Sequence, residues 1–176
     1  AFRGVLKHYL ERHRWNVAET VDLARAVQSA TGVNYDWWFH QWILSAGYPN
    51  LEVTYNWKAE EKLVELIIKQ TKPYEDGTAD EKHKPYFKLP LKVGFHVGGK
   101  LRVLPIHIEG KETRMIYPMD HKPSMVILDP DYECPVKVVK FSKAQDLLMM
   151  QLTEAPNAIS RLEAAEGFCN LILDSD

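Results

Sequence analysis

The spacing of apolar residues changes twice along this chain. At first they recur every three or four positions, as on one face of an α-helix, and from Leu51 they alternate with polar residues, as in a half-buried strand. After Ser142 the helical spacing returns. The pattern predicts an α+β, multi-part chain with a short helical N-terminal segment, an all-β antiparallel sandwich of about seven strands, and C-terminal helices. We expect the parts to divide as residues 1–47, 48–142 and 143–176.

The N-terminal part predicts three helices. The first has an apolar stripe formed by Phe2, Val5, Leu6, Tyr9 and His13. Thr20 is expected to cap the second helix, with Asp22 in the first turn, where the helix dipole favours an anion, and Gly32 to end it. The third should begin near Asn34 and end at Gly47 in a left-handed C-cap.

The central part predicts strands separated by turn residues. Alternation is expected over residues 51–57, 64–68, 87–97, 104–108, 115–117, 124–128 and 136–141. Glycines in Gly98-Gly99 and Gly110-Lys111 mark two of the turns. In the longest run, alternate residues should face inward, namely Phe87, Leu89, Leu91, Val93 and Phe95. Lys88 and Lys92 should then be exposed.

The C-terminal part predicts helices again. Ser142 is a candidate cap, and Pro156 separates two helical stretches. The second stretch has a stripe formed by Ile159, Leu162, Ala165 and Phe168, which has few expected partners to bury it. The chain also starts in the middle of a helical pattern without a Met. We therefore expect a piece of a longer protein.

An aromatic cluster precedes the first strand and admits two interpretations. Trp37, Trp38, Phe39 and Trp42 fall within six residues. They could stack on bases or bind a peptide, or they could pack a helix onto its neighbours. A stacking platform usually adjoins a basic groove, and no Lys or Arg lies between Ser29 and Lys58. We favour packing, with Trp38 and Trp42 on one buried stripe and Trp37 on the more exposed side.

Composition narrows the classes of partner. Of 176 residues, 45% are hydrophobic and 26% charged, which suits a folded core, and the formal net charge is −2. This balance predicts no nucleic-acid partner. The sequence has no apolar run of 18 residues, so no membrane span is expected. Cys134 and Cys169 are expected to be free, packed thiols. The few cysteines and the lack of a signal peptide suggest a cytoplasmic location.

The sequence contains no recognisable catalytic or metal-binding motif. No two of its seven histidines are four residues apart, so there is no HExxH motif. The segment "VGGK" fits a hairpin turn better than a phosphate-binding loop, and there is no GxSxG elbow. Asp129 and Asp131 flank Pro130 and fit a turn rather than an acid–base pair. We predict no catalytic, cofactor-binding or metal-binding residue.

The order of residues between Phe2 and Val53 resembles one family. The pattern "F-x-x-x-L-x-x-Y-L-x-x-H … T-x-D-L … W-F-x-Q-W-I-x-x-x-G-Y-P-x-L-x-V" is similar to the stretch just downstream of the active site in gluzincin aminopeptidases, the zinc family that includes aminopeptidase N. The later segments "GKETRMIYPMDHKPSMVILDPD" and "LMMQLTEAPNAISRLEAAEGF" resemble its sandwich domain and the entry to its helical, repeat-like C-terminal domain.

The resemblance implies a parent enzyme that removes N-terminal residues from peptides. In that family two histidines and a glutamate hold zinc, and the glutamate of HExxH activates water. A GxMEN-type motif binds the substrate amine, and a tyrosine stabilises the oxyanion. These motifs lie upstream of Ala1 in the family's order, so no residue here takes over their roles. Zinc is therefore implied for the parent protein and not for this chain.

Two functions follow as alternatives. The first is a non-catalytic fragment of a zinc aminopeptidase, with a structural role between the upstream catalytic domain and the downstream helical domain, which would be its partners. Peptide would be the parent's substrate, and neither nucleic acid nor membrane is expected as a partner. The second is a fragment of a peptidase-like, protein-binding scaffold, as in a TATA-binding-protein-associated factor that resembles these enzymes. Whether the parent is an active enzyme is left open by the sequence.

Overall fold

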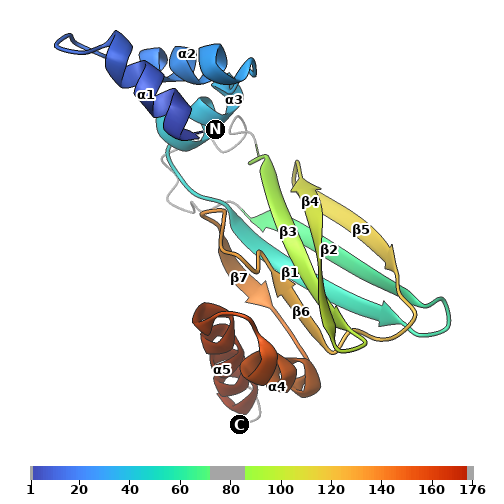
Figure 1. Cartoon of the computed structure of the whole chain (residues 1–176). Coiled ribbons are helices and arrows are strands. Elements are labelled where there is room, and N and C mark those ends of the chain that lie inside the picture. Colours follow the sequence, from blue (N-terminus) through green and yellow to red (C-terminus); the bar gives the residue numbers. More distant parts are fainter. Residues whose placement is uncertain (1, 72–85, 174–176) are drawn as a thin grey trace. The chain divides into compact units, whose positions relative to one another are not determined.

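The computed structural model describes residues 2–71 and 86–173 and separates into two compact units (Figure 1). The first unit is Ala1–Gly47 and the second is Tyr48–Asp176. The predicted fold class is confirmed, because the described residues form N-terminal helices, two β-sheets and C-terminal helices in that order. The division into three domains stays a prediction.

The first unit contains three helical segments. α1 (Phe2–Arg12) and α2 (Thr20–Thr31) pack together, with Val5 and Ala26 buried. A short α3 (Asp36–Phe39) continues into a π-helical turn, η1 (His40–Leu44). Gly32 ends α2 as expected, in the left-handed conformation with φ 73°, and its N–H donates to the Gln28 carbonyl at 2.8 Å.

Two helix ends differ from the prediction. Glu19, not Thr20, caps α2: its side chain accepts from the backbone N–H of Asp22, the third residue of the helix, while its own N–H donates to Asp22 Oδ2 at 3.0 Å. This reciprocal capping box uses two carboxylates and places Thr20 inside the helix. The helix before Gly47 ends earlier than expected, at Ser45, whose backbone is extended. Gly47 still has a positive φ of 107°, but as part of the connection that follows.

The second unit is built on two sheets. Its strands are β1 (Asn50–Lys58), β2 (Leu63–Thr71), β3 (Leu89–Val97), β4 (Lys100–Ile108), β5 (Glu112–Pro118), β6 (Met125–Leu128) and β7 (Lys137–Phe141). The four-stranded sheet has the order β5-β2-β1-β7, and the three-stranded sheet has the order β4-β3-β6. Their inner faces meet, since the Phe95 and Tyr117 rings lie 5.2 Å apart across the sandwich.

One strand pairing is not antiparallel. β7 runs parallel to β1, with Asn50 opposite Lys137, whereas the other pairs are antiparallel. After β6 the chain leaves the three-stranded sheet and crosses to the edge of the other sheet through residues 129–136. A parallel neighbour needs such a crossover, because a tight hairpin reverses the chain. The expectation of an entirely antiparallel sandwich was wrong for this strand.

The alternation predicted for β3 is confirmed. Four of the five expected inward residues are buried, namely Leu89, Leu91, Val93 and Phe95. Phe87 precedes the strand and is only partly buried, while Lys88 is exposed. Phe87 instead bonds Gln70, whose buried amide donates to the Phe87 carbonyl at 2.7 Å and to the Gly110 carbonyl at 3.0 Å. Gln70 thereby ties the end of β2 to both segments.

Two antiparallel helices complete the second unit. They are α4 (Gln145–Glu154) and α5 (Ala158–Leu173), and Ala144 rather than Ser142 precedes the first. Small residues of α5 face α4: Ser160 and Ala164 are buried, and a Cβ on Gly167 would lie 2.7 Å from Leu148 Cδ2. Among the described residues, no helix is long and apolar enough to cross a membrane.

Candidate functional site

The candidate site is the junction between the three-stranded sheet and the helices α4 and α5, where apolar and polar contacts between the two come together. β6 contributes Met125 and Ile127 to its outer face, and both are buried against Ala155, which follows α4. Leu101 and Met150 pack at the margin of this cluster. The apolar contact excludes water from the junction, but it has no preferred direction. The orientation of the two helices on the sheet therefore depends on polar groups.

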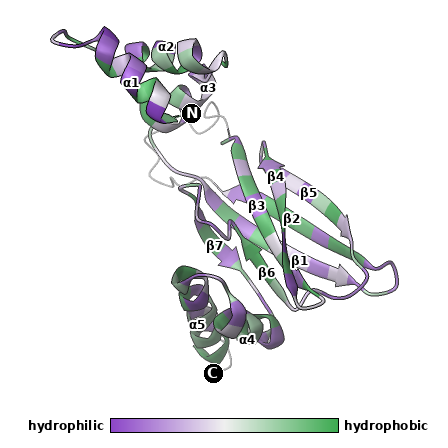
Figure 2. Ribbon diagram, in the orientation of Figure 1, coloured by the Kyte–Doolittle hydropathy of each residue, from purple (hydrophilic) through white to green (hydrophobic). Residues whose placement is uncertain are grey.

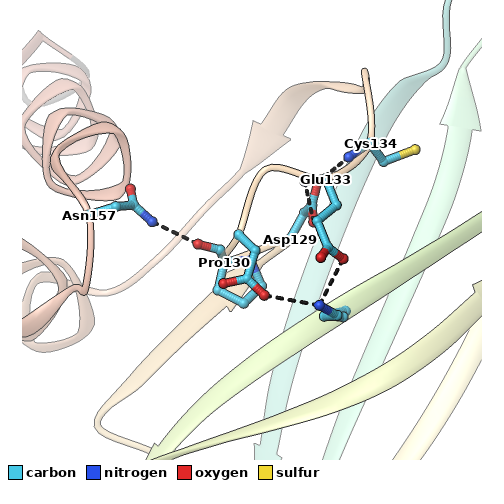
Figure 3. A network of polar contacts seen from close by, with 7 residues as sticks. Asp129, Pro130, Glu133, Cys134 and Asn157 are labelled. Atoms are coloured by element: carbon cyan, nitrogen blue, oxygen red, sulfur yellow. Dashed lines mark hydrogen bonds and ion pairs between the residues drawn. The ribbon is translucent and has the colours of Figure 1, made fainter. Parts of the chain in front are cut away.

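Asp129 organises the loop that leaves β6. It is 3% exposed and has φ 47°, a left-handed conformation that Asp tolerates better than most residues. Its carboxylate accepts from the backbone N–H groups of Glu133 at 3.2 Å and Cys134 at 3.0 Å, as Figure 3 shows. Its own N–H donates to the Lys92 carbonyl at 2.8 Å. The loop is thus folded around one buried side chain.

Lys92 holds the same loop from the outer face of β3. Its ammonium lies 2.7 Å from Glu133 Oε2 and 3.0 Å from Asp131 Oδ2. The hydrogen bonds to Glu133 and then to Asp131 raise the pKa of Lys92 above its ordinary value. The sequence predicted that Lys92 is exposed. In the structure it is only partly exposed, and it is ion-paired.

Asn157 connects the loop to the second helix. Its amide nitrogen donates to the Pro130 carbonyl at 2.7 Å (Figure 3). Its oxygen accepts from the Ser160 N–H at 2.8 Å. The second bond is an N-cap, because it satisfies a free donor in the first turn of α5. Tyr132 adds a hydroxyl contact of 3.2 Å to Ser160 Oγ. One side chain therefore caps α5 and fastens it to the sandwich.

A second polar chain runs between the helices. Gln151 of α4 is fully buried and donates to the Ser160 carbonyl at 2.7 Å, while its oxygen accepts from the Lys143 ammonium. Lys143 lies between β7 and α4, with its nitrogen 4.1 Å from the Phe141 ring centroid. Burial lowers the pKa of Lys143 to about 8, and the Glu163 carboxylate offsets part of that shift.

The depressed pKa of Lys143 predicts a pH effect on stability. The folded chain releases this proton near pH 8 and the unfolded chain near 10.5, so burying the charge costs stability below pH 8 and that cost fades between about pH 8 and pH 10.5. The free energy of unfolding of the wild type relative to Lys143→Met should rise across this window and stay level below it. Urea denaturation at several pH values measures the difference.

A matched control separates this effect from other alkaline titrations. Lys140→Met removes an exposed lysine of β7 and should give a level difference from the wild type. Burial and the Asp129 carboxylate raise the pKa of Cys134 to about 11, so its own contribution is lost as pH rises from 9 to 11 in every variant and cancels. If the difference in free energy of unfolding between the wild type and Lys143→Met did not change with pH, that result would contradict the burial of the Lys143 charge.

The aromatic cluster differs from its prediction. Phe39 is the buried member, 6% exposed, whereas Trp37 and Trp38 are each 40% exposed, and Trp42 is partly buried. The predictions that Trp38 lies inside and that Trp42 is largely buried were therefore wrong, whereas Trp37 is more exposed than Trp42, as predicted. For Trp42 the π-helical turn is the physical reason, because i→i+5 bonding rotates the residues after Phe39 relative to an α-helical stripe.

Other candidate residues do not come together in a reactive arrangement. Both cysteines are free; Cys134 is half-buried, and Cys169 is exposed rather than packed. In the part of the chain that the structure describes, no three His, Cys, Asp or Glu side chains are grouped so that they could hold a metal ion. Asp129 does lie at a turn, as predicted. Its burial and its two N–H bonds were missed, and the only sequence signal was Pro130 between two aspartates.

The arrangement can hold the helical pair in a fixed direction against the sandwich. Asp129 shapes the loop, Lys92 holds it to β3, and Asn157 joins it to α5. The groups are engaged with one another, and the raised pKa of Cys134 keeps its thiol protonated and unreactive near neutral pH. These contacts join the helical pair to the sandwich.

Comparisons with known proteins give a likeness of fold. The sequence matches no protein-family model, and it matches no curated protein. The structure is similar to that of Legionella pneumophila aminopeptidase A, solved in complex with aspartic acid, with a TM-score of 0.72 and 17% sequence identity. The match covers 97% of this chain and 19% of the Legionella chain. The chain thus has the fold of about a fifth of a much longer aminopeptidase.

Proposed function

We propose that this chain is a non-catalytic part of a zinc-dependent aminopeptidase, an enzyme that removes N-terminal residues from peptides. Its role there is structural: it links the catalytic domain to a C-terminal helical domain. The observation that carries the proposal is the likeness of fold to Legionella aminopeptidase A over 97% of this chain. The resemblance of residues 1–53 to gluzincin aminopeptidases supports the same parent from independent evidence, since it rests on the order of residues.

The chemistry of the parent is assigned to residues outside this chain. The described His, Cys, Asp and Glu side chains do not fit a zinc site, because no three of them are grouped. The remaining four-fifths of a chain such as the Legionella enzyme has ample length for one. Zinc would there activate water for attack on the peptide bond. No step of that reaction involves a residue of this chain.

The junction supports the linking role. A connector that orients a domain needs contacts of defined direction, and the hydrophobic effect that forms the apolar cluster is non-directional. The bonds of Asp129 and Asn157 have defined directions and fix the angle of α5. The upstream catalytic domain and downstream helical domain are the proposed partners. A cytoplasmic location without nucleic-acid or membrane partners belongs to the same proposal.

The proposal is tested on the longer natural protein. Its sequence before Ala1 should contain HExxH followed by a further ligand glutamate. The purified protein should hold zinc and cleave aminoacyl-arylamides in a chelator-sensitive way. A sequence without HExxH, and a protein that cleaves none of these substrates, would contradict the enzyme assignment and favour the protein-binding scaffold.

The isolated 176-residue chain should behave differently. We expect it neither to bind zinc stoichiometrically nor to cleave aminoacyl-arylamides, since no two of its histidines have the spacing of a zinc-binding helix. Elemental analysis and a fluorogenic assay measure both properties. Tight one-to-one zinc together with chelator-sensitive cleavage would show that this chain holds the active site itself.

A further inference from the structure

The two sheets end in β5 and β7 on one side of the sandwich and in β4 and β6 on the other, and no other described strand pairs with their outer edges. Such an edge presents backbone N–H and C=O groups that can pair with a further strand. Two of these edges are short and protected. β7 has five residues, among them Lys137 and Lys140, and its pairing with β1 shifts register. β6 has four residues, all buried, and packs against Ala155.

The edge of β4 is interrupted by a proline. The two-residue turn Gly98-Gly99 makes Val97 and Lys100 a hydrogen-bonded pair, so every second residue of β4 from Lys100 onward bonds β3. Pro105 belongs to the other set, whose backbone nitrogens point away from β3. Because proline has no N–H, the outer edge of β4 lacks a donor in its middle.

The edge of β5 has no such interruption between its first and last residues. The Gln70 N–H donates to the Lys111 carbonyl at 2.9 Å, and the Met119 N–H donates to the Lys62 carbonyl at 2.9 Å. These bonds lie just beyond the two ends of the β2–β5 pair and share its register, so the odd-numbered residues between them bond β2. The backbone groups that point away from β2 belong to the even-numbered residues, namely Glu112, Arg114, Ile116 and Pro118.

The charges on this edge are offset within their own sheet. The Lys69 ammonium lies 3.3 Å from the Glu112 carboxylate, and Arg114 forms an ion pair with Glu65. Ile116 is 55% exposed beside them, and Figure 2 shows both hydrophilic and hydrophobic colours along β5. The whole chain has a formal net charge of only −2, so repulsion between copies is small. Charge therefore does not keep a second strand away from β5.

The sandwich is also incompletely closed on its inner side at β5. Met115 and Tyr117 point toward the other sheet but are partly exposed. Leu66 and Val64, which lie opposite them on β2, are fully buried. A strand added beside β5 covers the exposed parts of Met115 and Tyr117 if its own inner side chains are apolar.

We propose that β5 is a dimerisation site, at which two copies of this chain pair their β5 strands antiparallel and join their four-stranded sheets into one. A two-fold axis at Met115 places Arg114 opposite Ile116 of the other copy, where their free N–H and C=O groups bond one another. On the inner side Met115 meets Met115, and Thr113 meets Tyr117. An axis at Arg114 would instead set two guanidinium groups opposite each other, which is unfavourable. The pairing uses residues of this chain alone and is independent of the proposed aminopeptidase parent.

Association in solution provides the first test. Sedimentation velocity of the 176-residue chain should show a monomer–dimer equilibrium that shifts with concentration. Ile116→Pro should weaken the dimer by about tenfold or more, because the N–H that it removes points to the other copy and not to β2, so each dimer loses two hydrogen bonds. Val103→Pro is the matched control, since its nitrogen also points outward, on the edge of β4, and it should leave the association unchanged.

Two results would overturn the proposal. One is a chain that stays monomeric at every concentration, and the other is a dimer that Ile116→Pro weakens no more than Val103→Pro. Circular dichroism checks that both variants fold. Ile116→Lys is a second variant that keeps the backbone N–H and sets a positive charge opposite Arg114 of the other copy, so it should also weaken the dimer. A dimer unaffected by Ile116→Lys would likewise contradict pairing through β5.

A cross-link tests the register. Met115→Cys, in a chain with Cys134→Ala and Cys169→Ala, places two thiols opposite each other in a pair without backbone hydrogen bonds, where the Cα atoms lie about 4.5 Å apart and a disulfide can form. Mild oxidation should give a covalent dimer. Thr113→Cys in the same background is the matched control, because Thr113 lies opposite Tyr117, and it should cross-link about tenfold more slowly. Equal rates for the two variants would overturn the pairing centred on Met115.

Discussion

Phe95→Ala is expected to lower the free energy of unfolding of the sandwich by about 3–5 kcal/mol, the usual cost of removing a buried aromatic side chain. Phe95 is fully buried in the C-terminal half of β3, and its ring centroid lies 5.2 Å from that of Tyr117 on the other sheet. The substitution removes this contact and leaves a cavity between the sheets. Urea denaturation followed by circular dichroism measures the loss.

Val103→Ala is the matched control for Phe95→Ala. Val103 lies on the neighbouring strand β4 and is partly exposed, so its truncation should cost about 0.5 kcal/mol or less. Similar midpoints for the two variants would show that Phe95 does not lie in the core between the two sheets.

Asp129→Ala is expected to cost about 2–4 kcal/mol. The substitution leaves the N–H groups of Glu133 and Cys134 without their acceptor, and a buried orphan donor costs about 1–3 kcal/mol. Alanine also fits the left-handed backbone at φ 47° poorly, which adds about 1 kcal/mol. Denaturation by urea, together with hydrogen exchange of α4 and α5, should show a weaker helical pair.

Asp129→Asn is the matched control at the same position. Asparagine tolerates the left-handed conformation and keeps one oxygen that can accept a hydrogen bond, so it should lose clearly less stability than alanine. Equal losses for the two variants would mean that the carboxylate bonds do not hold the loop. An unchanged exchange rate in α4 and α5 would mean that the loop does not hold the helices.

The strands could be predicted because their signal is local. The alternation of Leu89, Leu91, Val93 and Phe95 requires only that one face of a strand be buried. The glycines at Gly98 and Gly99 have positive φ values of 58° and 76°, which is why the sequence marks that turn so clearly. Pairing partners are not local, so the parallel β1–β7 contact could not be predicted from the same pattern.

The junction could not be predicted because its parts are far apart in sequence. Lys92 pairs with Asp131, 39 residues away, and Asn157 donates to the Pro130 carbonyl, 27 residues away, so neither contact can be read from a local pattern. Helix α5 shows the same limit from another side. The large residues of α5 suggested a buried face, but close packing against Leu148 required the small ones, Ala164 and Gly167.

The central claim is that the junction holds the helical pair rigidly on the sandwich, and a distance measurement tests it most directly. One spin label is placed on native Cys169 of α5 and another on Lys69→Cys, at an exposed position of β2, in a chain with Cys134→Ala. Double electron–electron resonance should give one narrow distance distribution, which should broaden when Asp129→Ala and Asn157→Ala are added. A broad distribution before those two substitutions, or an equally narrow one after them, would contradict the claim.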